Sequence, residues 1–340
     1  MKLNQYFTIG IISVAALMTA VTPVLAEEVN ERLIRLGDLN LPGNAGYLGA
    51  MKFVELVGAK SGGKLKIKYF PSSTLGNELQ QQAALRGGTQ EMFISAPSTL
   101  AGIVKDFGLL DLPFTFDSVE MARAVVDGPF GNLLLDKLAE KDIIGLAYWE
   151  FGFRNVTNNK RPVTKVEDFK GIKLRVMPNA VFIDTFSALG ANPVPMNMGE
   201  VYVGLESQTI DGQENSASVV RAAKLNEVQK YFSITNHCFN ANLLQVGKKF
   251  WDKLTPTEKK ILKEAALEAR DYERKVSVEQ TKQALDEMKA KGMQVNEVSA
   301  FELEKMSQKT QPVKEKILKE YDKASVKLFL SEIERLKHAE

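Results

Sequence analysis

The stretch Gly171-Ile172-Lys173-Leu174-Arg175-Val176 decides the fold class, because it reads as a short β-strand followed by a helix signal at Pro178 and a helical pattern over residues 180–189. The same alternation of short β-rich runs with longer helical patterns fills the chain, which is typical of an α/β protein. The other strands that we predict cover residues 33–39, 65–70, 91–95, 143–148 and 243–246, and the other helices cover residues 45–59, 78–86, 118–126, 131–140 and 216–227.

The longest predicted element begins at Thr255-Pro256-Thr257-Glu258, which supplies a capping hydroxyl, a proline at the first helical position and a glutamate at the third. From Thr257 to about residue 291 there is no proline or glycine, so we expect a helix of about 50 Å at about 1.5 Å per residue. This helix either braces two lobes or forms a surface coiled coil. Its apolar positions do not keep a clean heptad repeat, which favours the helix that braces two lobes. After Gly292 and the short run 293–298, a charged helical region runs from residue 301 to the C-terminus.

The N-terminus has the features of a secretory signal: Lys2, an apolar run over residues 7–21, and small residues before Ala26. The run is shorter than the roughly 20 residues that span a bilayer. We therefore expect cleavage near Ala26 and a soluble mature chain in the periplasm. The 340 residues less these 26 leave 314, enough for two domains. We predict that residues 27–151 plus 240–279 form lobe I and residues 152–239 plus 280–340 form lobe II.

Charge and cysteine content exclude several classes of protein. The 44 basic side chains less Lys2 leave 43 against 42 acidic ones, so we expect no nucleic-acid partner. Cys238 is the single cysteine, which excludes a disulfide within the chain and a lipid anchor at the new N-terminus. We expect Cys238 to be a buried, apolar-like residue.

The sequence shows no pattern typical of an enzyme. It has no Gly-x-Ser-x-Gly elbow, no Walker loop and no glycine fingerprint after a strand. Its two histidines, His237 and His338, are too far apart for a two-histidine metal motif on one helix. We predict that the protein is not an enzyme and needs no metal or cofactor.

Two arginines are candidates for binding an anion. Arg154 and Arg175 each lie at the end of a β-like run, where open α/β sheets place their ligand sites. Burying a guanidinium is costly without an anionic partner, which is either a ligand or an internal Asp or Glu. Both interpretations stay open for each arginine.

From about residue 34 to residue 254 the chain resembles the substrate-binding subunits of tripartite ATP-independent periplasmic (TRAP) transporters, the DctP family. The matching pieces follow one another in the same order. They are Phe70-Pro71-Ser72-Ser73-Thr74-Leu75-Gly76-Asn77-Glu78, Leu112-Pro113-Phe114, Gly152-Phe153-Arg154-Asn155-Val156-Thr157-Asn158, the opening stretch 171–176, Gly190-Ala191-Asn192-Pro193-Val194-Pro195-Met196, Glu200-Val201-Tyr202 and Ile210-Asp211-Gly212-Gln213-Glu214-Asn215.

The resemblance implies a two-lobed periplasmic binding protein with a cleft between the lobes and a long helix spanning both. Arg175 matches the arginine that clamps the ligand carboxylate, and a planar guanidinium can give one carboxylate two parallel hydrogen bonds. Arg154 matches a second arginine that often contacts ligand, and Asn215 matches an asparagine that orients the carboxylate or the clamp. The implied partners are the small and large membrane subunits of a transporter, and we expect a monomer.

Polar groups of the other lobe should recognise the rest of the ligand through hydrogen bonds. Glu78 is the leading candidate, although a carboxylate there also suits the start of a helix. Ser95, Asn197 and Asn240 are further candidates. Trp149 either stacks on an apolar face of the ligand or fills the cleft wall.

Two further runs of residues resemble one branch of the family and indicate the class of substrate. The runs Leu146-Ala147-Tyr148-Trp149-Glu150 and Arg86-Gly87-Gly88-Thr89 resemble the branch that includes diketogulonate and hexuronate binders, so we favour a sugar acid. Phe151 departs from this branch, which often has a polar residue there. The alternatives are a four-carbon dicarboxylate or keto acid, or a receptor module that senses ligand; an enzyme would turn a bound sugar acid over.

Overall fold

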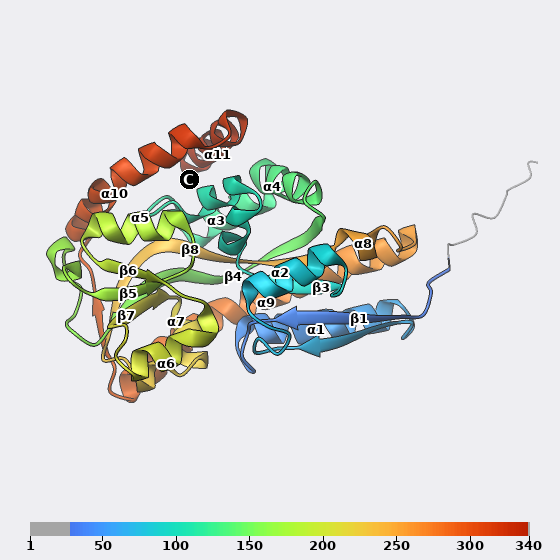
Figure 1. Ribbon diagram of the computed structural model, residues 1–340, viewed down its shortest axis with the longest axis horizontal. Coiled ribbons are helices and arrows are strands. Elements are labelled where there is room, and N and C mark those ends of the chain that lie inside the picture. Colours follow the sequence, from blue (N-terminus) through green and yellow to red (C-terminus); the bar gives the residue numbers. More distant parts are fainter. Residues whose placement is uncertain (1–27, 339–340) are drawn as a thin grey trace, which may run out of the picture.

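The computed structural model describes residues 28–338, so the predicted signal peptide lies outside the described residues. Within them, nine strands form one sheet in the order β2-β1-β3-β8-β4-β7-β5-β6, with β9 paired to β8 (Figure 1). The strands are β1 (Arg32–Asp38), β2 (Leu65–Phe70), β3 (Met92–Ser95), β4 (Ile143–Asn158), β5 (Lys173–Val176), β6 (Asn192–Pro195), β7 (Gly212–Asn215), β8 (Tyr231–Gly247) and β9 (Gln294–Glu297). The helices are α1 (Ala45–Lys60), α2 (Glu78–Gly87), α3 (Val119–Asp127), α4 (Pro129–Ala139), α5 (Ala180–Leu189), α6 (Val201–Glu206), α7 (Ala217–Ala222), α8 (Lys248–Trp251), α9 (Pro256–Ala290), α10 (Ala300–Glu320) and α11 (Lys323–Lys337). The predicted α/β class is confirmed.

Strands β4 and β8 join the two halves of the sheet. They are antiparallel and have 16 and 17 residues, whereas β1 to β3 pair at one end of them and β5 to β7 at the other. Between Glu150 and Phe153 their register shifts, so that two residues of β4 stand opposite the single residue Asn240 of β8. Gly152 takes a φ of +74° there, in the left-handed region that favours glycine. Such a bulge bends a strand, and here β4 passes from one lobe to the other.

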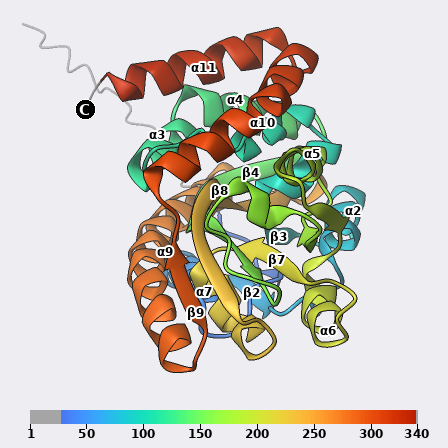
Figure 2. The same cartoon turned by 90° about the vertical axis from the view of Figure 1, so that its left-hand side faces the viewer.

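Helix α9 runs along both lobes for 35 residues (Figure 2). Its start is capped as predicted: Thr255 Oγ1 accepts a hydrogen bond from Glu258 N (3.2 Å), and the Glu258 carboxylate accepts one from Thr255 N (2.9 Å). Its first half packs in the hydrophobic core formed with α1 and β1, whereas Ala284 and Met288 pack in a separate core with α6 and α7. The helix therefore braces the lobes, and the coiled-coil alternative is wrong.

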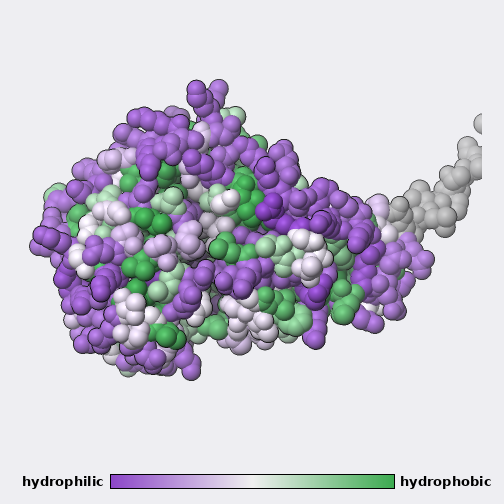
Figure 3. Space-filling view, in the orientation of Figure 1, coloured by the Kyte–Doolittle hydropathy of each residue, from purple (hydrophilic) through white to green (hydrophobic). Residues whose placement is uncertain are grey.

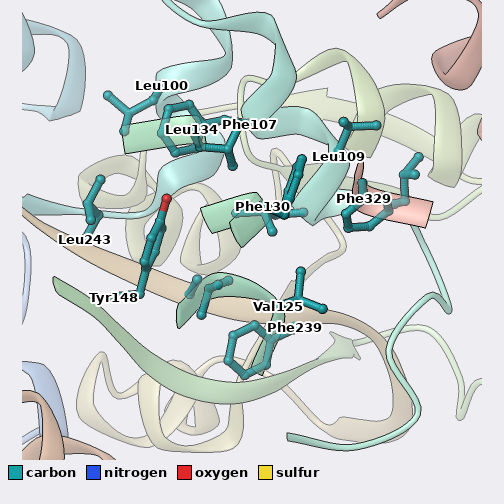
Figure 4. Packing of buried hydrophobic residues seen from close by; sticks show 14 of the residues in the cluster. Leu100, Phe107, Leu109, Val125, Phe130, Leu134, Tyr148, Phe239, Leu243 and Phe329 are labelled. Carbon is teal, nitrogen blue, oxygen red and sulfur yellow. The ribbon is translucent and has the colours of Figure 1, made fainter. Parts of the chain in front are cut away.

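The charged C-terminal region forms the two helices α10 and α11, which lie over α3, α4 and α5 (Figure 2). Phe329 of α11 packs on Phe130 of α4, with 4.8 Å between the ring centroids. Figure 4 shows these rings in the largest apolar cluster, together with Phe107 and Tyr148. The division of the chain into lobes at residues 151, 239 and 279 stays a prediction.

Several strands escaped prediction because their residues are polar or irregular. Strand β6 contains Pro193 and Pro195, and β7 has the sequence Gly-Gln-Glu-Asn, which is fully buried despite its polarity. Strand β9 and the first part of β8 were also missed. The predicted helix 216–227 is shorter, because Lys224 takes a φ of +53° and ends it.

The single cysteine is buried, as expected. Cys238 is 3% exposed and burial raises the pKa of its thiol, which keeps it in the unreactive form. On the face drawn in Figure 3, hydrophilic residues predominate and hydrophobic ones form separate small patches. Among residues 28–338, no helix combines the length and apolar character needed to cross a bilayer.

Replacing the cap of α9 should destabilise the protein. We expect Thr255→Ala to lower the free energy of unfolding by about 1 kcal/mol, because the N–H of Glu258 loses its acceptor. Thr257→Ala is the matched control, since the Thr257 hydroxyl makes no hydrogen bond within the described residues. Urea denaturation of both variants measures the difference; equal stabilities would contradict a role for the cap.

Candidate functional site

A cavity of about 480 Å³ opens between the two halves of the sheet. One wall comes from the C-terminal ends of β1 and β3, the start of α2 and the bulge of β4 and β8, and the other from β5, β7, α6 and α7. The polar residues that line it are Asp38, Asn40, Asn44, Ser72, Ser73, Glu78, Ser95, Thr99, Arg154, Arg175, Tyr202, Asn215, Asn240 and Asn242. Six of the eight predicted site residues therefore meet at one cavity.

Arg175 lines this cavity as a buried cation without a carboxylate partner. Its side chain is 1% exposed, and its Nε donates a hydrogen bond to Met196 O (2.8 Å). Its Nη1 has no hydrogen-bond partner within residues 28–338, and no described carboxylate lies within 4 Å. Burial lowers its pKa to about 10, which shows how poorly its charge is compensated. An anion in the cavity would supply the missing partner.

Arg154 lines the same cavity but has an internal partner. Its Nη2 lies 2.8 Å from Oε1 of Glu214 and its Nε bonds Oε2 of the same carboxylate. His237 Nε2 lies 3.1 Å from that Oε2, and the guanidinium stacks on the Phe182 ring at 5.4 Å. Although burial acts in the opposite direction, Arg154 and His237 keep the pKa of Glu214 below its usual value.

The pairing of Arg154 explains why Arg175 is unpaired. The Glu214 charge stabilises the protonated form of Arg175, second only to burial among the effects on its pKa. Both oxygens of Glu214 are held by Arg154 and one also by His237, so this carboxylate is already engaged by other partners. Arg154 thus has the internal carboxylate partner that one of the two interpretations requires, and its role as a ligand contact stays a prediction.

Two asparagines connect the walls of the cavity. Asn215, at the end of β7, accepts a hydrogen bond at Oδ1 from Nδ2 of Asn240 (3.2 Å) and another from Ser216 N (3.0 Å). Asn240 stands opposite the bulge of β4. This contact crosses from the strand next to Arg175 to the strand that enters the other lobe.

Glu78 and Ser95 lie on the wall of the first lobe. The helix α2 is capped by Asn77 and Gln80, whose side chains bond each other's backbone N–H, so Glu78 is not the capping residue. Its side chain is 6% exposed and makes no hydrogen bond within the described residues. Ser95 Oγ accepts from Gln245 Nε2 (2.8 Å), which leaves its hydroxyl proton free to donate.

The structure does not bring Trp149 and Asn197 to the cavity. Trp149 is fully buried in the core with Leu146 and Leu244, so its indole cannot stack on a solute. Asn197 precedes a short 3-10 helix, where its N–H donates to the Glu200 carboxylate (3.2 Å). Its neighbours Met198 and Gly199 line the cavity instead.

Sequence reasoning missed a polar network at the end of β1. Asp38 accepts hydrogen bonds from Asn40 N (2.9 Å), Asn40 Nδ2 (2.7 Å) and the Tyr69 hydroxyl (2.7 Å), and Asn44 Nδ2 donates to Asn40 Oδ1 (3.1 Å). Burial raises the pKa of Asp38 to about 6. The available signal was Asn40, a polar residue directly after the predicted strand 33–39. No group of three or more His, Cys, Asp or Glu side chains within residues 28–338 is arranged to hold a metal ion.

Proteins with a named ligand are similar to this chain. The chain is 41% identical over 249 residues to the 2,3-diketo-L-gulonate-binding periplasmic protein YiaO of Escherichia coli K12, covering 73% of this chain and 76% of that protein. It is 33% identical over 285 residues to the C4-dicarboxylate-binding periplasmic protein DctP of Rhodobacter capsulatus, covering 83% and 84%. These relatives are substrate-binding proteins.

The fold is similar to that of the sugar acid binding protein DctPAm of Advenella mimigardefordensis strain DPN7T in complex with galactonate. The TM-score is 0.88 at 37% identity, over 91% of this chain and 99% of that one. Residues 37–321 match the DctP family, described as bacterial extracellular solute-binding protein, family 7. The chain therefore belongs to the DctP family of solute-binding proteins, whose members work with TRAP transporters.

Proposed function

We propose that this protein binds a sugar acid in the periplasm, holds its carboxylate with Arg175 and delivers it to the membrane subunits of a TRAP transporter. The observation that carries the proposal is the buried guanidinium of Arg175, which lines the cavity without a carboxylate partner among the described residues. A ligand carboxylate would accept two parallel hydrogen bonds from such a group and would offset the cost of burying it.

The groups on the opposite wall favour hydroxyls over a second carboxylate. Glu78 accepts hydrogen bonds but repels an anion, whereas Ser95 and Asn240 can both donate and accept. A sugar acid offers one carboxylate and several hydroxyl donors, which fits this distribution. One relative is a diketogulonate-binding protein and another was solved in complex with galactonate, which supports sugar acids as the ligand class.

A ligand bound between the two walls would also favour closure of the two lobes around it. A ligand that contacts Arg175 on one lobe and Glu78 on the other favours the arrangement in which both contacts form at once. The energy for transport must come from the membrane subunits. The four-carbon dicarboxylate alternative keeps the arginine clamp and places a second carboxylate near Glu78.

A thermal-shift screen tests the substrate class. The mature chain is heated with hexuronates, aldonates, keto-sugar acids or four-carbon dicarboxylates, because a ligand that binds only the folded state raises Tm. We expect a rise with sugar acids. A rise with dicarboxylates alone would reject the substrate class and keep the clamp, and no rise with any carboxylate would contradict the proposed function.

Removing the clamp should abolish most of the affinity. We expect Arg175→Ala to lose about 2–5 kcal/mol of binding free energy for the best sugar acid, since the ligand carboxylate loses its charged donor. Arg175→Lys should also bind weakly, because an ammonium cannot give two parallel hydrogen bonds. The control is Arg35→Ala, which removes a half-exposed arginine paired with Glu91 away from the cavity. Calorimetry that finds wild-type affinity in Arg175→Ala would refute the clamp.

Glu78 should set the preference for a single carboxylate. We expect Glu78→Gln to weaken sugar-acid binding and to strengthen binding of succinate by about tenfold, because the repulsion of a second carboxylate disappears. Glu55→Gln, an exposed glutamate of α1, is the control. If the ratio of the two affinities stays unchanged in Glu78→Gln, Glu78 does not decide between the ligands.

A further inference from the structure

The inner face of α9 is apolar toward both ends of the helix and polar in the middle. Residues 261–269 pack in the apolar core of the first lobe, and the last turns pack in the apolar core of the second. Between them the buried side chains are Glu273, Ser277 and Gln280, whose spacing of four and three residues puts them on one face. We call these three residues the polar segment of α9.

The polar segment meets β4 where β4 crosses between the lobes. Glu273 Oε2 accepts a hydrogen bond from Glu150 N (3.2 Å), and Glu150 is the last regularly paired residue before the bulge. The neighbouring Arg274 donates to Tyr148 O (2.9 Å). From the other side α1 approaches so closely that a Cβ on Gly49 would lie 2.8 Å from the Glu273 side chain. Three elements are therefore packed around the Glu273 carboxyl.

The same segment stands directly behind the cavity wall. Gln280 Nε2 donates to Gly43 O (2.8 Å), and Gly43 lies between the cavity residues Leu41 and Asn44. Phe151, which follows Glu150 in the bulge, also lines the cavity. A shift of α9 against β4 would therefore move two parts of the wall.

The charges around Glu273 leave it without a counter-ion. It faces Glu150 from β4, Arg123 from α3 and Arg274 from its own helix, with Asp127 of α3 beyond Arg274. Arg123 binds both oxygens of Glu150 (2.7 and 2.6 Å), and Arg274 binds both oxygens of Asp127 (2.6 and 3.0 Å). Burial and the Glu150 charge raise the pKa of Glu273 well above its usual value.

Buried polar groups are less fully hydrogen-bonded where α9 meets β4 than in the apolar cores on either side. Within residues 28–338, five buried polar atoms at this contact have no hydrogen-bond partner: Trp149 Nε1, Glu273 Oε1, Arg274 Nε, Ser277 Oγ and Gln280 Oε1. Each such group lacks the hydrogen bond that it would make with water, which is a cost in free energy. Opening the contact to water regains part of this cost, so the contact opens more easily than the cores beside it.

We propose that Glu273 is a positioning residue for the ligand cavity: in its uncharged form it holds the β4 crossing against α9, and its ionisation lets this contact open. The proposal depends on the packing of α9, α1 and β4 and not on which solute occupies the cavity.

The direction of the pH dependence follows from the raised pKa. A buried acid that is easier to protonate in the closed contact than in the open one favours the closed contact at low pH. The closed form is most stable below the ordinary pKa of 4.5 and loses stability as the pH rises toward the raised value. A glutamine at this position keeps an acceptor for Glu150 N and removes the ionisation.

Hydrogen exchange of the mature chain, measured by mass spectrometry near pH 5 and near pH 8 and corrected for intrinsic rates, tests the proposal. We expect the peptide containing the Glu150 amide to exchange at least about tenfold faster near pH 8 than near pH 5 in the wild type. In Glu273→Gln it should stay protected at both values. Glu273→Leu should exchange faster at both, because the amide has no acceptor. Glu279→Gln, an exposed glutamate on the same helix, should behave as the wild type.

Two results would overturn the proposal. One is equal protection of the wild type and Glu273→Gln near pH 8, and the other is wild-type protection of Glu273→Leu near pH 5. Amides of β1 report on global unfolding in the same experiment. If Glu273→Leu also loses protection in β1, the comparison of Glu273→Gln with the wild type decides the matter alone.

Discussion

The rest of the site depends on one electrostatic arrangement, in which Glu214 is held by Arg154 and His237 and Arg175 is left without a carboxylate. A buried arginine is stable only beside an anion or at the boundary of a cavity that can admit one. Because Arg154 and His237 engage Glu214, the guanidinium of Arg175 stays available for the ligand carboxylate that we propose.

The bulge of β4 and β8 connects this electrostatic arrangement to the two-lobed fold. It places Phe151 and Asn240 at the cavity and turns the sheet from one lobe into the other at the same point. Asn240 then bonds Asn215 of the strand beside Arg175. The cavity wall and the crossing of the sheet between the lobes are consequently neighbours.

Buried ionisable side chains of the described residues differ in whether they have a counter-ion. Arg123 with Glu150 and Arg154 with Glu214 are paired at both ends and hold elements together. Among those without a counter-ion in the described residues are Arg175 at the cavity and Glu273 behind it, and burying such a group in its charged form is costly. One faces the place of the solute and the other faces the crossing between the lobes. The apolar cores on either side of α9 supply the stability that tolerates both.

The sequence by itself determined the elements whose signals are local. The cap at Thr255, the strand before Pro178 and the order of motifs that identifies the family are all read within a few residues, as is the presence of polar groups after strands. The buried polar strand β7, the place of Trp149 in the core and the network of Asp38 were decided only by tertiary contacts. Arg154 and Arg175 illustrate the limit: both end a β-like run, and their difference depends on Glu214, which lies 60 residues from Arg154 in the chain and becomes its partner only when β4 and β7 pair.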